Sequence, residues 1–305
     1  MTFLVDIVLW IFRPVPLRAR VWLGCVVGWF LHSVLRLRRK VVTEQIGWAF
    51  PELDDGERAG LIRRVYRHFG LLGLEYLRMA FMSSEDVIAT CQVKGRENLD
   101  KAHAKGRGVF ILGAHDGAWE LGASRGALLG YDTSAVLKEI KGSLGQYAVD
   151  RLRQTNAIEA IPRRNSVRQI LRALKSGRLV GFVLDQNMTS DEGVFVDFFG
   201  KPACTMAGLA VLSQRAGAAV VPAHNYRNED LRAHTVEFLP EVEWEEPYED
   251  KEQNILHNTQ RYTTILENMI RRHPEQWNWL HKRWKTKPDP STGNLADEAT
   301  KEQSA

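Results

Sequence analysis

Short apolar runs alternate with helical patterns along most of this chain, and this alternation limits the folds that the chain can adopt. The expected strands lie at residues 109–112, 134–137, 157–161, 179–184, 194–198, 218–222 and 235–239. The expected helices lie at residues 57–82, 119–129, 145–155, 166–175, 205–216 and 250–273. Strands that alternate with helices form a mostly parallel sheet with helices packed on it. The sequence therefore predicts an α/β fold with a mostly parallel central sheet flanked by helices.

The amino-terminal segment is both apolar and strongly basic. Residues 1–40 contain seven Arg and Lys residues and one acid, a local charge of +6 in a chain whose total is +4. Two apolar runs, residues 3–12 and 21–35, are separated by a stretch that contains Pro14 and Pro16. Neither run reaches the roughly 20 apolar residues that span a bilayer comfortably, and the prolines argue against one continuous helix. We therefore expect an apolar helix that lies in the membrane interface rather than one that crosses it.

The second run has the pattern of such an interfacial helix. Four of its large apolar side chains recur at helical spacing: Trp22, Val26, Trp29 and Phe30. The basic cluster at residues 36–40 follows at once, where it would contact anionic head groups. The alternative is a first helix that packs against the domain as part of its core. No nucleic-acid-binding motif accompanies the basic cluster, so the expected partner is a membrane surface and not nucleic acid.

Cysteines are few and motifs for cofactors are missing. Cys25, Cys91 and Cys204 are far apart without C-x-x-C spacing, which predicts neither a disulfide framework nor a zinc cluster. No pattern typical of nucleotide or metal sites occurs, and we expect no metal and no bound cofactor. Residues 122–126 match the G-x-S-x-G hydrolase motif in letters. Ser124, however, falls inside an expected helix and not on the sharp turn that this motif needs.

The candidate catalytic pair is His115 and Glu120, an H-x4-E motif that follows the apolar run at residues 109–112. The turn would place His115 at the carboxyl end of a strand, the usual position of a site in an open α/β sheet. Glu120 would lie in the first turn of a helix, where free backbone N–H groups favour a carboxylate. Such a histidine can take a proton from a hydroxyl, while the carboxylate fixes its tautomer. The alternative is that His115 caps the helix and Glu120 is an ordinary first-turn acid.

Several stretches of the chain together resemble one protein family. In chain order they are Arg39-Lys40, Glu44-Gln45-Ile46, Ala49-Phe50-Pro51-Glu52, residues 113–120, Asp185-Gln186-Asn187, residues 194–205 and residues 274–285. They resemble the late acyltransferases of lipid A biosynthesis, the lauroyl- and myristoyltransferases, to which the bacterial phosphatidylinositol mannoside acyltransferases are related. The resemblance runs in order through residues 5–287.

The resemblance implies a glycerolipid acyltransferase-like fold and a membrane-associated enzyme on the cytoplasmic face of the inner membrane. Such an enzyme moves a fatty acyl chain from an acyl carrier protein or coenzyme A thioester to a hydroxyl of a lipid A precursor. We accordingly divide the chain into a membrane anchor at residues 1–40, an acyltransferase domain at residues 41–287 and a disordered tail at residues 288–305. The family's histidine and acidic residue correspond to His115 and Glu120.

Further residues are expected in or near the site. The family has an arginine that stabilises the oxyanion or binds a phosphate, and it corresponds to Arg163 or Arg164. Arg164 is favoured. The alternative is that both arginines form a solvated surface pair. Asp185 ends the apolar run at residues 179–184 and is expected to contact a sugar hydroxyl or Arg164, unless it caps a turn. Backbone N–H groups near Gly117 are expected to bind the oxyanion. The tryptophans of the last stretch are expected in the core, with an aromatic belt at a membrane interface as the alternative: Trp277, Trp279 and Trp284.

The chain departs from the family's pattern at two positions. Ala118 stands where the family commonly has asparagine, and an aspartate at position 116, directly after the histidine, is unusual. A second carboxylate in Asp116 would favour the imidazolium and raise the pKa of His115. Two other functions therefore stay open. One is an acyltransferase of another glycolipid or lysophospholipid pathway, and the other is a catalytically silent lipid-binding homologue.

Overall fold

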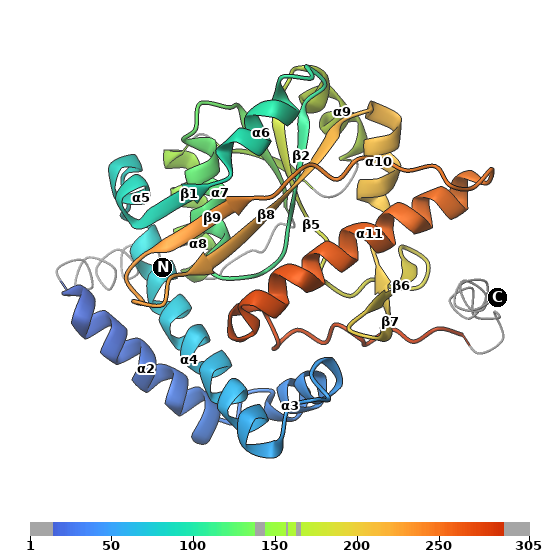
Figure 1. Cartoon of the computed structure of the whole chain (residues 1–305). Helices are drawn as coiled ribbons and strands as arrows, with labels where there is room; N and C mark the ends of the chain where they lie inside the picture. The colour runs from blue at the N-terminus through green and yellow to red at the C-terminus, as the bar shows by residue number, and fades with distance from the viewer. Residues whose placement is uncertain (1–14, 138–143, 157, 163–165, 290–305) are drawn as a thin grey trace.

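The computed structural model describes residues 15–137, 144–156, 158–162 and 166–289. A seven-stranded sheet in the order β1-β9-β8-β2-β5-β3-β4 forms the centre, and β6 pairs with β7 in a separate two-stranded sheet. Helices flank the central sheet (Figure 1). The strands are β1 (Cys91–Lys94), β2 (Val109–Gly113), β3 (Thr133–Leu137), β4 (Glu159–Pro162), β5 (Leu179–Val183), β6 (Val194–Phe198), β7 (Lys201–Thr205), β8 (Ala219–Arg227) and β9 (His234–Phe238).

The described residues contain the six expected helices, together with further helices that have no expected counterpart. The helices of the described residues are α2 (Leu17–Ser33), α3 (Arg39–Ala49), α4 (Asp55–Met79), α5 (Ser84–Thr90), α6 (Arg96–His103), α7 (Trp119–Ala127), α8 (Leu144–Thr155), α9 (Val167–Lys175), α10 (Gly208–Ala216) and α11 (Lys251–Arg272), with a short 3-10 helix η1 (Pro274–Gln276). All neighbours in the central sheet are parallel except β8 and β9, which are antiparallel. The predicted α/β class with a mostly parallel sheet is confirmed. The predicted tail at residues 288–305 lies almost entirely outside the described residues.

The expected helix at residues 205–216 begins later than predicted because its first residue belongs to a hairpin. Thr205 pairs with Val194 in the antiparallel β6–β7 sheet, and α10 begins only at Gly208. The two residues between the strands, Phe199 and Gly200, have φ values of 56° and 71°. Two positive φ values in a two-residue loop match the twist of the flanking strands, so this loop closes a tight hairpin.

The carboxyl-terminal stretch packs into the core, as predicted for its tryptophans. Trp277, Trp279 and Trp284 are 1%, 0% and 4% exposed. Arg283 is fully buried among them, and its Nη1 donates to the Cys204 carbonyl oxygen at 2.7 Å. A buried guanidinium is tolerated where backbone carbonyls accept its hydrogen bonds. The segment at residues 277–284 is therefore bound to the β6–β7 hairpin.

Helix α2 packs closely on α4 because three glycines meet at their crossing (Figure 1). A Cβ at Gly70 of α4 would lie 2.1 Å from the carbonyl oxygen of Gly24 on α2. A Cβ at Gly28 would lie 2.5 Å from the carbonyl oxygen of Tyr66. Glycine at four-residue spacing lets two helix backbones touch, as at small-residue interfaces in membranes. One face of α2 is therefore fixed to the domain.

The opposite face of α2 is exposed and apolar. Its large side chains include Trp22, Trp29 and Phe30, which are 67%, 61% and 43% exposed. The helix thus combines the two alternatives that the sequence left open, since it packs on the domain with one face and presents aromatic residues with the other. Within the residues that the structure describes, no helix is long and apolar enough to cross a membrane. The association of α2 with a membrane stays a prediction.

Replacing Gly70 with alanine should separate α2 from α4, because the added methyl group would meet backbone atoms that have little freedom to move. We expect Gly70→Ala to lower the free energy of unfolding by about 1–3 kcal/mol. Gly73, on the same helix, is the matched control because a Cβ there meets nothing within 4 Å. Gly73→Ala should stabilise the helix by about 0.5–1 kcal/mol. Chemical denaturation measures both, and equal stability of the two variants would rule out a tight crossing.

Candidate active site

His115 lies in a turn between β2 and α7 that requires a glycine. Strand β2 ends at Gly113 and α7 begins at Trp119, so His115 lies at the carboxyl end of a strand, as predicted. Gly117 has a φ of 51°, and a Cβ there would lie 2.4 Å from the carbonyl oxygen of Asn225 on β8. Both the left-handed backbone and the close approach to β8 call for glycine at this position.

The carboxyl-terminal segment holds the same turn from the other side. The Gly117 N–H donates to the Gln276 carbonyl oxygen at 3.0 Å, and the Asn278 N–H donates to the His115 carbonyl oxygen at 3.1 Å. Between these two hydrogen bonds, Asp116 and Trp277 pair as an isolated antiparallel β-bridge. The N–H of Gly117 itself is used by Gln276, and the expectation that backbone N–H groups near Gly117 bind the oxyanion stays a prediction for its neighbours.

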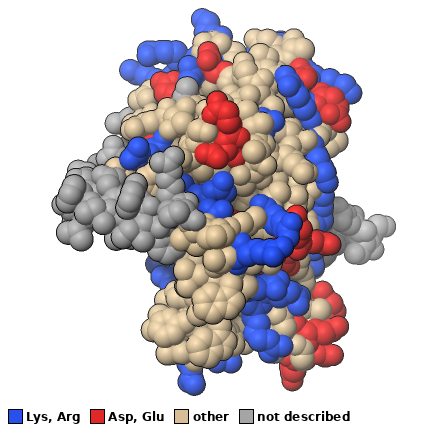
Figure 2. Space-filling view, turned by 90° about the vertical axis from the view of Figure 1, so that its left-hand side faces the viewer, with Lys and Arg blue, Asp and Glu red and all other residues tan. Residues whose placement is uncertain are grey.

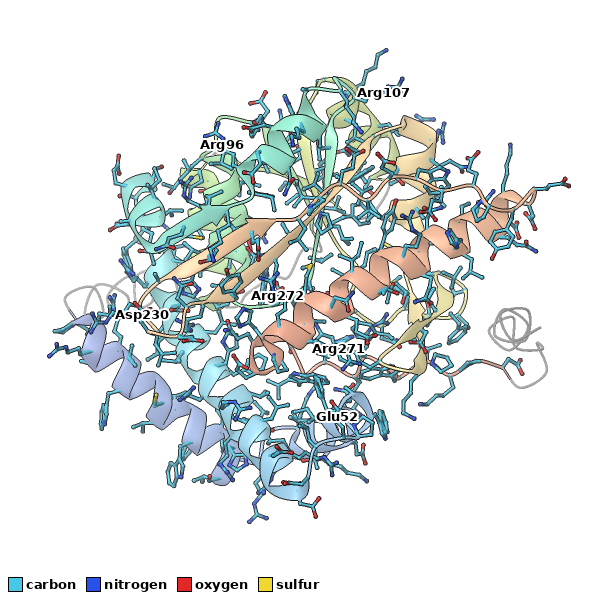
Figure 3. All side chains as sticks on the ribbon, in the orientation of Figure 1. Glu52, Arg96, Arg107, Asp230, Arg271 and Arg272 are labelled. Carbon is cyan, nitrogen blue, oxygen red and sulfur yellow. The ribbon has the colours of Figure 1, made fainter. Side chains whose placement is uncertain are left out.

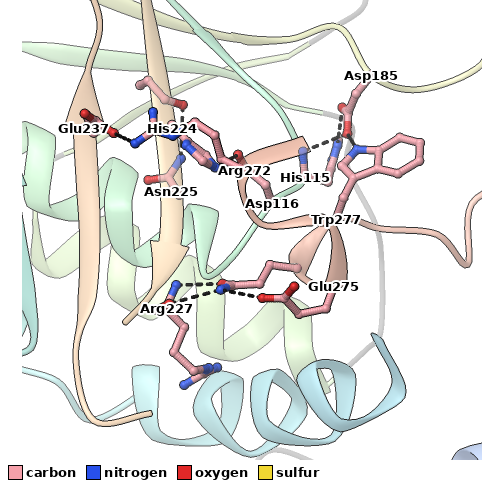
Figure 4. Close-up of polar contacts among 12 residues, drawn as sticks. His115, Asp116, Asp185, His224, Asn225, Arg227, Glu237, Arg272, Glu275 and Trp277 are labelled. Atoms are coloured by element: carbon pink, nitrogen blue, oxygen red, sulfur yellow. Dashed lines mark hydrogen bonds and ion pairs between the residues drawn. The ribbon is translucent and has the colours of Figure 1, made fainter. Parts of the chain in front are cut away.

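Asp185 is the carboxylate that binds His115 (Figure 4). Its Oδ1 lies 2.7 Å from His115 Nδ1, and its Oδ2 accepts from the His115 backbone N–H at 2.8 Å. Trp277 Nε1 donates to the same Oδ2 at 2.7 Å. Asp185 thus contacts the histidine itself, a pairing that the sequence analysis did not predict, and its expected contact with a sugar hydroxyl or Arg164 stays a prediction.

The register of two neighbouring strands explains this pairing. Strands β2 and β5 are parallel, and Gly113 stands opposite Val183. His115 and Asp185 each come two residues after these partners, so they leave the sheet at the same edge and side by side. In an open α/β sheet this edge is where ligands bind.

The contact with Asp185 leaves the second ring nitrogen of His115 free to act as a base. A carboxylate only accepts, so Nδ1 carries the proton and Nε2 keeps its lone pair. The His115 side chain is 17% exposed, and the amide nitrogen of Gln186 lies 3.2 Å from Nε2. The ring of Trp119 meets the imidazole edge to face, with centroids 5.1 Å apart. A substrate hydroxyl that displaces the Gln186 amide would therefore meet Nε2 directly.

The two groups shift each other's pKa in opposite directions. Burial lowers the pKa of His115, but the charge and hydrogen bond of Asp185, with a smaller contribution from Glu120, outweigh burial and raise it above its usual value. Burial opposes ionisation of Asp185, yet His115 and the hydrogen bonds from His115 and Trp277 lower the pKa of Asp185 to about 2. The pair thus favours an ionised carboxylate and stabilises the imidazolium that forms when Nε2 takes a proton.

Glu120 lies in the first turn of α7, as predicted, but its carboxylate binds Arg153 of α8. Arg153 Nε donates to Glu120 Oε2 at 2.9 Å, and Arg153 Nη2 donates to Glu120 Oε1. His115 and Glu120 are both described, and no hydrogen bond or ion pair joins them. The expectation that Glu120 fixes the tautomer of His115 is corrected, because Asp185 on the adjacent strand occupies Nδ1.

Asp116 points away from the imidazole into the interior. It is 2% exposed, and its Oδ2 lies 3.5 Å from Nε2 of the buried His224 on β8. Burial and the charge of Asp185 raise the pKa of Asp116 well above its usual value, which disfavours a charged carboxylate at this position. The expectation that Asp116 raises the pKa of His115 is therefore wrong, since Asp185 and Glu120 supply that effect.

Other expected features of the site are placed only in part. Arg163 and Arg164 lie outside the described residues, and the expected role of Arg164 stays a prediction. Ser124 is buried inside α7, which confirms that the hydrolase-like letters around it form no nucleophile turn. The sequence analysis does not identify Arg153, because no sequence pattern indicates that this residue of α8 binds an acid on α7. Among the described residues, no three His, Cys, Asp or Glu side chains are arranged to hold a metal ion.

Comparison with known proteins agrees with the resemblance. The family model described as bacterial lipid A biosynthesis acyltransferase matches residues 1–286. The lipid A biosynthesis palmitoleoyltransferase of Escherichia coli (strain K12) is 28% identical over 284 residues, which cover 92% of this chain and 90% of that protein. The lauroyltransferase of the same strain is 27% identical over 293 residues, with the same coverage. A phosphatidylinositol mannoside acyltransferase of Mycobacterium tuberculosis is 26% identical over 198 residues, 63% of this chain and 59% of that protein.

Asp185→Asn should lower the pKa of His115, because the substitution removes the charge that opposes burial. Glu120→Gln should lower it as well but by less, since Glu120 has the smaller effect. Titration of the labelled imidazole by NMR in the intact protein measures both shifts. The activity of Asp185→Asn should correspondingly begin to rise at a lower pH than that of the wild type. A larger effect of Glu120→Gln than of Asp185→Asn would contradict the pairing described above.

Proposed function

The chain belongs to the bacterial lipid A biosynthesis acyltransferase family and is an acyltransferase, and we propose that it transfers a fatty acyl chain to a hydroxyl of a lipid A precursor. One observation carries the proposal. His115 is held at Nδ1 by the buried carboxylate of Asp185, while its Nε2 borders a partly exposed site. This arrangement suits a general base that acts on a hydroxyl.

In the proposed reaction the acyl donor is a thioester of acyl carrier protein or coenzyme A. His115 Nε2 takes the proton of the acceptor hydroxyl as the hydroxyl oxygen attacks the thioester carbonyl carbon. The carbon–sulfur bond then breaks, and the imidazolium gives its proton to the departing thiolate. The products are an ester and a free thiol, and His115 returns to its starting state. No covalent acyl-enzyme is required.

Asp185 acts through His115 as a positioning residue. It keeps the proton on Nδ1, orients the ring and stabilises the imidazolium, the part that a buried aspartate plays in Ser-His-Asp sites. The carboxylate of Asp185 is itself held by two donors from separate segments. Trp277 Nε1 donates to Oδ2 at 2.7 Å, and the His115 backbone N–H donates to the same oxygen at 2.8 Å. We assign no contact between Asp185 and the lipid.

Glu120 and Arg153 form the second charged pair of the proposed site. Their side chains are 11% and 12% exposed, so the pair is screened from water. We propose that Glu120 holds Arg153 in place, and that Arg153 joins Arg164 as a candidate donor to the negative charge that develops on the carbonyl oxygen. The H-x4-E motif would then serve the oxyanion rather than the tautomer of His115.

We propose that α2 keeps the enzyme at the cytoplasmic face of the inner membrane. The exposed side chains of Trp22 and Trp29 suit the interface between head groups and acyl chains, where aromatic rings are favoured. On the face of the molecule that carries α2, Lys and Arg side chains gather beside a broad uncharged area (Figure 2). Basic groups next to apolar surface favour a membrane of anionic lipids.

His115→Ala should lower turnover by about 10²–10⁴-fold, the range that general-base assistance contributes. Asp185→Asn should lower kcat strongly with little change in KM, because Asp185 is proposed to act on His115 and not on the lipid. The assay follows transfer of a radiolabelled acyl chain from acyl carrier protein to purified lipid A precursor, with circular dichroism as the folding control. His115→Ala with more than about a tenth of wild-type turnover would contradict the role of His115. Unchanged lipid A in a strain lacking this protein would point to another glycolipid acceptor.

Replacing Trp22 and Trp29 together with serine should weaken binding to vesicles by about tenfold or more. Each indole buries up to about 150–250 Å² of surface, at about 25 cal/mol per Å². Val211→Ser on α10 is the matched control, because Val211 is 41% exposed and lies on a helix remote from α2 (Figure 1). Co-sedimentation with anionic vesicles measures the binding. If the double variant sediments like the control, α2 is not the membrane contact.

A further inference from the structure

A second feature of the molecule lies between α2 and α4, next to the crossing glycines, and has no part in the proposed reaction. It is a partly enclosed cavity of about 30 Å³ between the beginning of α2, the last turns of α4 and the end of β8 with the turn that follows it. Asp230 marks this turn in Figure 3, beside the amino-terminal end of α2. A water needs roughly 10–15 Å³ of such space. The cavity therefore has room for two or three oxygen-sized groups.

Four arginines line this cavity: Arg20, Arg78, Arg227 and Arg232. Glu75 is the acid among the lining residues, and both of its oxygens accept from Arg227. The charge of Arg227 is thus neutralised, and three guanidinium charges remain around a small space. These three positive charges repel one another at close range, and an anion bound between them would offset the repulsion.

The arginines keep hydrogen-bond donors that the protein does not use. Within the described part of the chain, the Arg20 guanidinium has no hydrogen-bond or ion-pair partner. Arg78 has a single ion pair, with Asp86 at 3.9 Å. Arg227 is 4% exposed, and its Nε has no partner. Burial and the nearby charge of Arg78 lower the pKa of Arg20, and the charge of Glu75, which acts in the opposite direction, offsets only part of this effect.

The beginning of α2 adds to the positive potential of this cavity. The helix starts at Leu17 after Pro16, with no side-chain cap and no acid in its first turn. Leu17 and Arg20 both line the cavity, so the free N–H groups and the dipole of the first turn lie beside it. Phosphate groups bind at helix amino-terminal ends for this reason.

We propose that this cavity binds the phosphate group of an anionic lipid. Guanidinium groups match phosphate oxygens with paired hydrogen bonds, and three of them with a helix amino-terminal end supply more donors than one phosphate needs. The rest of the wall is apolar and includes Val21 of α2 and Leu74 of α4. Since α2 also presents the exposed Trp22, a lipid whose head group lies in the cavity can place its acyl chains along this helix.

The site is independent of His115, so binding rather than turnover tests it. The full chain, solubilised in a nonionic detergent, is titrated calorimetrically with dihexanoyl phosphatidylglycerol, with dihexanoyl phosphatidylcholine and with inorganic phosphate. Arg20→Gln and Arg78→Gln should each weaken phosphatidylglycerol binding by about tenfold or more, because each removes charge-assisted hydrogen bonds. Arg18→Gln is the matched control. It removes the same charge from an exposed position on the same helix and should change binding by less than about twofold.

The three probes separate a lipid from a free anion. Tight phosphatidylglycerol binding, with weaker binding of both other probes, supports the proposal. Inorganic phosphate that binds as tightly as phosphatidylglycerol and depends on Arg20 would overturn the lipid as the occupant in favour of a free phosphate. Equal binding by the wild type and Arg20→Gln, or no binding of any probe, would overturn the site. If Arg78→Gln unfolds, the result for Arg20→Gln alone tests the proposal. Arg20→Lys keeps the charge and should bind phosphatidylglycerol more tightly than Arg20→Gln does.

Discussion

A buried carboxylate must find donors for its oxygens, and Asp185 meets this requirement with groups from distant parts of the chain. His115 donates from the end of β2, and Trp277 donates from the carboxyl-terminal segment. The same segment also binds the turn around Gly117 through the carbonyl oxygen of Gln276. The site is therefore complete only when the centre of the sheet and the last described residues have come together. This explains why so many tryptophans of the last stretch are buried although they lie near the end of the chain.

Most of the sheet could be predicted because its strands are apolar runs bounded by polar turns. The errors fell where local sequence does not decide the structure. Thr205 reads as the start of a helix, yet the turn at Phe199 and Gly200 returns the chain into a hairpin that includes it. Helix α5 is an error of another kind, because it begins with a capping box between Ser83 and Asp86 and could have been predicted from local sequence. The crossing of α2 with α4 depends on a glycine in each helix, and no single segment shows that the two will meet.

The candidate site was predictable in its parts but not in its connections. His115 and Asp185 were both identified because each follows an apolar run. That they touch follows from the neighbouring positions of β2 and β5, and strand order is set by packing of the whole domain. Proximity in sequence pairs Glu120 with the histidine, but residues five apart on a turn and a new helix need not face each other. Arg153, from a helix far along the chain, supplies the countercharge.

Gln186 gives the resting site protection against water. Its amide nitrogen lies 3.2 Å from His115 Nε2, so the lone pair of the base already accepts a hydrogen bond when no acceptor is bound. If the donor is the proposed thioester, a water molecule that attacks it would have to displace this amide without the binding energy that a large lipid brings. In the proposed reaction, hydrolysis of a thioester donor would thereby be disfavoured relative to transfer of its acyl chain to the lipid.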